Sequence, residues 1–77
     1  MLVKLQYASI PQVRMIAVHY WFVTEGESRD RWEVWQESDA RGLSVGHLHR
    51  NLLHPDSHVG GGPTRIERTW DMDRCLS

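Results

Sequence analysis

His19 is the residue of this chain whose sequence neighbours most favour a chemical role. It lies inside the apolar run from Ile16 to Val23, between bulky side chains. A neutral imidazole that is buried without partners costs roughly 1–3 kcal/mol, so we expect a hydrogen-bond partner or a cleft beside it. A histidine on a β-strand suits a general base, because the sheet fixes its position. A hydrogen-bonded core histidine without chemistry is the alternative.

The partner of His19 depends on the register of the predicted hairpin. If Val23 pairs with Trp32, His19 faces Gln36, and the Gln36 amide is then the group that orients the ring. A slip of one residue moves every side chain to the other face and places Trp35 opposite His19 instead. The sequence leaves both registers open.

Four histidines within twelve residues form a second candidate site, a zinc site, made of His47, His49, His54 and His58. Imidazole is a common zinc ligand, and histidines two apart on a strand point to the same side. Their spacing, however, matches no established zinc signature, and polar loop histidines also accumulate without binding a metal. We therefore predict that the protein has no cofactor, with zinc as the alternative.

Residues 13–24 and 31–37 must position His19, and both are predicted strands. The first is rich in Val, Ile, Tyr, Trp and Phe, and is apolar on both faces, which predicts a central strand covered on both sides. The second alternates, with Trp32 and Val34 on one face and Arg31, Glu33 and Trp35 on the other. The polar, glycine-containing segment 25–30 joins them as an antiparallel hairpin.

The other segments are less regular. Residues 2–10 read as an edge strand or extended arm that ends at Pro11, and residues 64–72 as a third strand. Residues 45–53 fit either a strand or a short helix. The run Gly60–Pro63 favours a flexible connection over a phosphate-binding loop. We therefore expect one small domain over residues 1–77, of the α+β class and mainly antiparallel β.

Composition excludes several functional classes. The chain has 77 residues, with nine basic and ten acidic side chains and no charge runs, so we expect no nucleic-acid partner. The longest apolar stretch is far shorter than the roughly 20 residues of a membrane span, and no signal peptide is evident, so we expect a cytoplasmic protein. A single cysteine, Cys75, forms no internal disulfide and is treated as incidental.

The segments Ala17–Val23, Arg31–Trp35, Gly46–Leu52 and Gly60–Pro63, in this order, resemble a family of small bacterial proteins of unknown function. Those proteins are in turn similar to circularly permuted papain-like domains of the lecithin:retinol acyltransferase type. The resemblance implies that His19, in a His-x-Trp pattern, holds the position of the catalytic base. It also implies that a nucleophile-bearing helix follows the last strand.

That helix has no counterpart in the sequence, because the chain ends seven residues after Trp70. We therefore expect an N-terminal fragment of a hydrolase or acyltransferase domain that is catalytically silent alone. Such a fragment exposes a sheet edge and apolar surface, which predicts self-association. The competing expectations are the zinc-binding module and a protein-interaction module anchored by Trp21 or Trp35.

Overall fold

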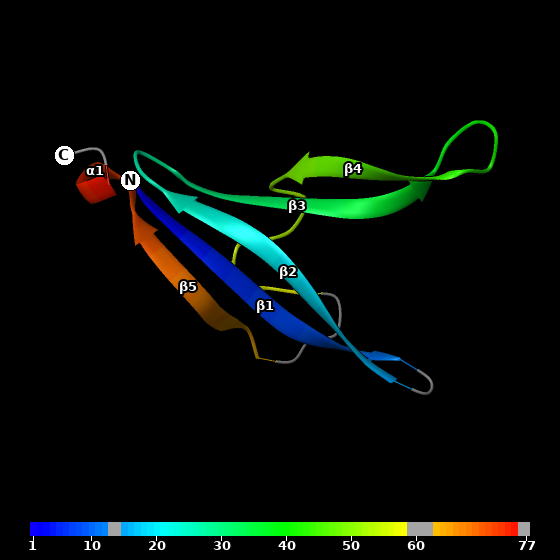
Figure 1. Cartoon of the computed structure of the whole chain (residues 1–77), viewed down its shortest axis with the longest axis horizontal. Helices are drawn as coiled ribbons and strands as arrows, with labels where there is room; N and C mark the ends of the chain where they lie inside the picture. Colours follow the sequence, from blue (N-terminus) through cyan, green and yellow to red (C-terminus); the bar gives the residue numbers. More distant parts are fainter. Residues whose placement is uncertain (13–14, 59–62, 76–77) are drawn as a thin grey trace.

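The computed structural model describes residues 1–12, 15–58 and 63–75. It is a five-stranded antiparallel sheet with one short helix, shown in Figure 1, so the predicted fold class is confirmed. The predicted Gly60–Pro63 connection lies mostly outside the described residues. The elements along the chain are β1 (Leu2–Gln12), β2 (Met15–Glu25), β3 (Arg29–Ser38), β4 (Ser44–Arg50), β5 (Arg65–Asp71) and α1 (Met72–Cys75).

The strands are ordered β4-β3-β2-β1-β5, which places β2 in the centre as predicted. The prediction of an edge strand at residues 2–10 is wrong, because β1 pairs with β2 on one side and with β5 on the other. The pairing with β5 ends at Tyr7, however, so at Pro11 the strand β1 pairs with β2 alone. Proline, which has no backbone N–H to donate, is tolerated at such a position. The ambiguous segment 45–53 contains β4, an edge strand.

The hairpin register differs by one residue from the first one considered. Phe22 pairs with Trp32 and Val23 with Arg31, so the pairing of Val23 with Trp32 is wrong. The pairing of β2 with β3 extends only from Phe22 to Glu25, at the turn end of the hairpin. Beyond it the two strands separate, as Figure 1 shows.

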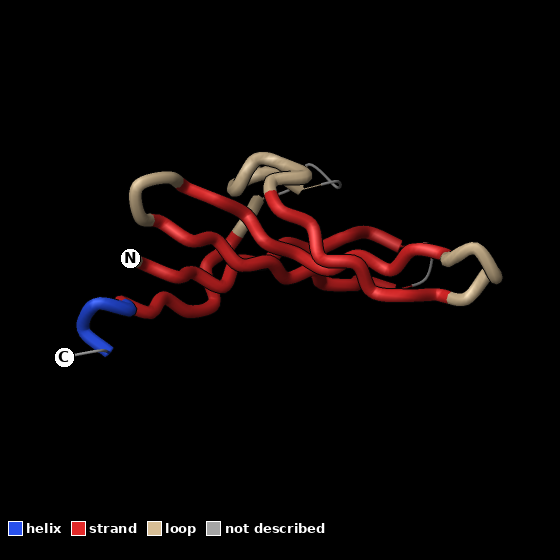
Figure 2. Tube along the Cα trace, turned by 90° about the horizontal axis from the view of Figure 1, so that it is seen from above, coloured by secondary structure: helices blue, strands red, loops and turns tan. Residues whose placement is uncertain are grey.

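One face of the sheet is covered by residues 51–58, and Figure 2 shows this loop on one side of the strands. We call this the covered face. Its buried side chains include polar and charged groups beside the small apolar core; they are Gln6, Ala8, Trp21, Val23, Arg31 and Glu33.

The opposite, open face carries the apolar side chains that alternate with these residues. On β2, Val18, Tyr20 and Phe22 are 44–47% exposed. The expectation that this strand is covered on both sides is therefore wrong for the described residues. The physical reason is that, among the described residues, the loop of residues 51–58 crosses the face that offers hydrogen-bonding groups.

Candidate functional site

The site is built around a hydrogen bond between two neighbouring strands. Nε2 of His19 on β2 lies 2.7 Å from Oε2 of Glu33 on β3. Both side chains are largely withdrawn from solvent, with exposed fractions of 13% and 0%. The charge-assisted bond lies just beyond the last paired residues of the hairpin, where β2 and β3 begin to separate.

Arg31 fixes the Glu33 carboxylate. Residues 31 and 33 share a face because side chains alternate along a strand. The guanidinium donates from Nε to Oε1 and from Nη2 to Oε2 of Glu33, each at 2.9 Å. This bidentate geometry is the strongest form of the arginine–carboxylate pair, and both side chains are completely buried.

The loop over the covered face completes the coordination of Arg31. Its Nη1 donates to the carbonyl of His54 at 2.9 Å and also to the carbonyl of Ser57. The guanidinium carbon lies 4.0 Å from the ring centroid of Trp21. The Trp21 indole N–H in turn donates to the carbonyl of Pro55 at 2.8 Å. The loop therefore lies against the sheet through buried polar contacts.

The pKa of Glu33 is lowered from its ordinary 4.5. Burial acts in the opposite direction, since it penalises the charged form, but the hydrogen bonds from Arg31 and His19 outweigh it. Glu33 is thus an anion at neutral pH and accepts the bond, so the proton of a neutral His19 ring sits on Nε2. The Nδ1 lone pair of that tautomer is the one that takes up a proton.

Two aromatic rings hold the His19 imidazole. The Trp35 ring stacks on it with centroids 4.0 Å apart and an interplanar angle of 25°, and the Trp21 ring lies 5.8 Å away. His19 and Glu33 also line an opening of about 310 Å³ between β2 and β3. Its remaining walls are mainly apolar side chains, among them Phe22, Trp32 and Leu48.

Gln36, the residue predicted to orient His19, has another partner. Its Oε1 accepts a hydrogen bond of 2.9 Å from the Ser44 hydroxyl, while Glu33 holds the His19 ring. The alternative register, with Trp35 opposite His19, agrees with the observed pairing, and the Trp35 ring stacks on the imidazole. Glu33 was missed because it lies two residues from Trp35 on the same face of β3, diagonal to His19 and not opposite it. The sequence signal for this contact was the pair Arg31 and Glu33, which are opposite charges two residues apart in a strand with two tryptophans.

The four clustered histidines are distributed over a strand and a loop. His47 and His49 share the Glu37 carboxylate, at 4.0 Å and 2.7 Å, whereas the His54 ring accepts a hydrogen bond from the Asp56 amide in the loop. Within the described ranges, no three metal-ligating side chains are grouped to hold an ion. Zinc binding stays a prediction.

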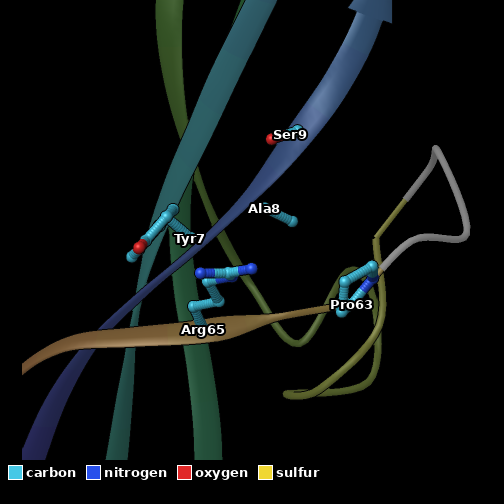
Figure 3. A pocket seen from close by; sticks show the side chains of 5 residues that line it. All are labelled: Tyr7, Ala8, Ser9, Pro63 and Arg65. Carbon is cyan, nitrogen blue, oxygen red and sulfur yellow. The ribbon is translucent and has the colours of Figure 1, made fainter.

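A second cavity, of about 270 Å³, lies between β1 and β5 at the start of β5. Figure 3 shows it lined by Tyr7, Ala8, Ser9, Pro63 and Arg65. It shares no lining residue with the opening beside His19, although Ala8 pairs in register with His19. In the described part of the chain, no helix is long and apolar enough to cross a membrane.

Comparison of the chain with family models, with curated proteins and with solved structures finds no match.

Proposed function

We propose that this chain provides the general-base half of an acyl-transfer site, with His19 as the base and Glu33 as the residue that positions it. The observation that carries the proposal is the 2.7 Å bond between a partly buried histidine and a fully buried carboxylate beside an opening in the sheet. A base oriented by a third group is the common arrangement of nucleophilic catalysis.

Each contact has a defined task in this proposal. The Nδ1 atom of His19 takes the proton of an attacking hydroxyl or thiol as that group bonds to the acyl carbon. Glu33 stabilises the imidazolium that forms, and Arg31 keeps Glu33 ionised. The proton then passes from His19 to the leaving group. The resemblance to permuted papain-like domains implies the same role for His19, and it implies that the nucleophile comes from a later segment.

The proposal is testable without that nucleophile, because a small thiol can replace it. N-acetylcysteamine and p-nitrophenyl acetate are mixed with the protein at neutral pH, and p-nitrophenolate release is followed. General-base assistance in complete sites is worth about 10²–10⁴-fold, and we expect about tenfold more assistance from His19 than from a surface histidine.

His19→Ala should remove most of the protein-dependent rate, and Glu33→Gln should reduce it. His47→Ala is the matched control, since this β4 side chain is 46% exposed and should be dispensable. Circular dichroism verifies that each variant folds. Equal rates for His19→Ala and His47→Ala would contradict the proposed base.

A further inference from the structure

The open face of the sheet is an extended apolar surface. Strand alternation places ten apolar or aromatic residues on it: Val3, Leu5, Tyr7, Val18, Tyr20, Phe22, Trp32, Val34, Leu48 and Trp70. Ring contacts of Tyr7 with Tyr20 and of Phe22 with Trp70, at centroid distances of 5.3 and 6.3 Å, join it across strands. Val34 and Leu48 are 54% and 68% exposed. Patches of this kind mark interaction sites.

Arginines lie at both margins of the open face. Arg50 on β4 lies over Trp32, and Arg68 on β5 lies over Trp70, at 5.0 and 5.2 Å from the ring centroids. Arg65, also on β5, pairs in register with Tyr7. Both arginine-bearing strands are the outermost strands of the sheet.

Acidic side chains are scarce on the same face. Among the described strand residues that the register assigns to one face, Asp30 is the one acid on the open face. Its carboxylate already pairs with Arg50 at 3.2 Å. Glu67 lies at the bulge between β1 and β5, where the register shifts. Among the described residues, the open face is thus apolar in the middle and positively charged along the β5 margin, where Arg65 and Arg68 lie, whereas Asp30 neutralises Arg50 at the β4 margin.

We infer that the open face docks an amphipathic α-helix whose apolar stripe is flanked by Asp and Glu on the side that lies over β5. In the row where all five strands are paired, from Arg50 on β4 to Arg68 on β5, they span about 19 Å at about 4.8 Å spacing, while a helix with its side chains is about 10–12 Å across. A helix lying over the three inner strands there brings one flank above the β5 arginines and the other above the Arg50–Asp30 pair. Apolar anchors at helical spacing and charged flanks are the usual features of helix-in-groove recognition.

The charges also distinguish this occupant from a second copy of the chain. Two open faces packed together would bring two sets of marginal arginines into one interface, with Asp30 as the acid that the register places there. Like charges at an interface cost affinity. An acid-flanked helix removes this repulsion and covers the apolar surface.

The test uses two synthetic helical peptides that share one leucine stripe, flanked by glutamate in one and by lysine in the other. Binding to the whole chain is measured from tryptophan emission and by calorimetry. We expect the glutamate peptide to bind at least about tenfold more tightly, a difference of about 1.4 kcal/mol. Added salt should reduce this preference.

Two pairs of variants locate the binding surface. Leu48→Asp should abolish binding, whereas Leu43→Asp, at another exposed position (55% against 68%) in the turn between β3 and β4, should not. Arg68→Glu should weaken the glutamate peptide and strengthen the lysine peptide. Arg41→Glu, at a side chain that is 80% exposed, should change neither.

Light scattering on the free chain completes the experiment. A monomer that binds the glutamate peptide, with these variant effects, supports the inference. A stable dimer that Leu48→Asp dissociates would assign the face to a second copy and overturn it. Absence of binding, or equal affinity for both peptides, would overturn it as well.

Discussion

Arg31 and Glu33, two residues apart on β3, form a bidentate ion pair in which neither side chain reaches solvent. Three further polar contacts converge on this pair, from the His19 ring and from the carbonyls of His54 and Ser57. The pair thus joins the proposed base on β2 to the loop that covers the sheet. Both the stability of the fold and the geometry of His19 depend on it.

Removing one member of the pair should destabilise the protein strongly. Arg31→Met removes the cation from a buried ion pair and leaves the Glu33 carboxylate with the His19 ring as its remaining partner. Breaking a buried pair in this way costs about 3–5 kcal/mol. A small domain has about 5–15 kcal/mol of stability in total, so urea unfolding should show a large loss or an unfolded chain.

The double variant Arg31→Met/Glu33→Leu should recover much of this loss, because no buried charge is then left unpaired. Asp56→Asn is the control: it breaks the exposed pair with Arg29 and should cost less than about 1 kcal/mol. An Arg31→Met variant as stable as Asp56→Asn would contradict the structural role of the buried pair.

Stability should fall in acid, and Glu33 should account for part of the fall. Its pKa is lower in the folded protein than the ordinary 4.5. Its stabilising contribution is therefore complete above about pH 4.5 and is lost as the pH falls through the lower folded pKa. The free energy of unfolding, measured by urea at pH values from about 6 to 3, should decrease over this window.

The Glu33→Gln variant should show a shallower slope over the same pH window, whatever its absolute stability. The curve should not become flat, because hydrogen bonds to Ser28 and Asn51 also lower the pKa of Asp30, and the bond to Arg29 lowers that of Asp56. An unchanged slope in Glu33→Gln would exclude Glu33 as a contributor.

Asn51, directly after β4, should be sensitive to substitution for two separable reasons. Its φ of 56° lies in the left-handed region, and its side chain bonds the Arg31 amide and the Asp30 carboxylate at 2.7 Å each. Asn51→Gly keeps the favourable backbone and loses the bonds, which should cost about 1–3 kcal/mol.

Asn51→Ala loses the same bonds and adds about 1 kcal/mol of backbone strain. Thermal unfolding of the two variants therefore separates the contributions. Equal melting temperatures for the glycine and alanine variants would show that the left-handed conformation carries no cost here.

The sequence by itself determined β2, β3 and β5 as strands and the antiparallel class of the sheet. Alternation and β-branched or aromatic content placed β2 and β3 and the turn between them, and the apolar character of β2 indicated its central position. His19 was found in the same way, because an imidazole within an apolar strand needs a partner. These features are local, since they depend on the chemistry of neighbouring residues along one segment.

Only the tertiary structure decided the register, the place of β1 and the choice of the covered face. A one-residue slip exchanges Gln36 for Trp35 opposite His19 and turns Glu33 to the His19 side of β3. The local sequence pattern does not choose between the two registers, because β2 is apolar on both faces. The pairing of β1 with β5 joins segments about sixty residues apart. The loop covers the polar face because Arg31 and Trp21 can donate to its carbonyls there, whereas the apolar face offers its backbone few such partners.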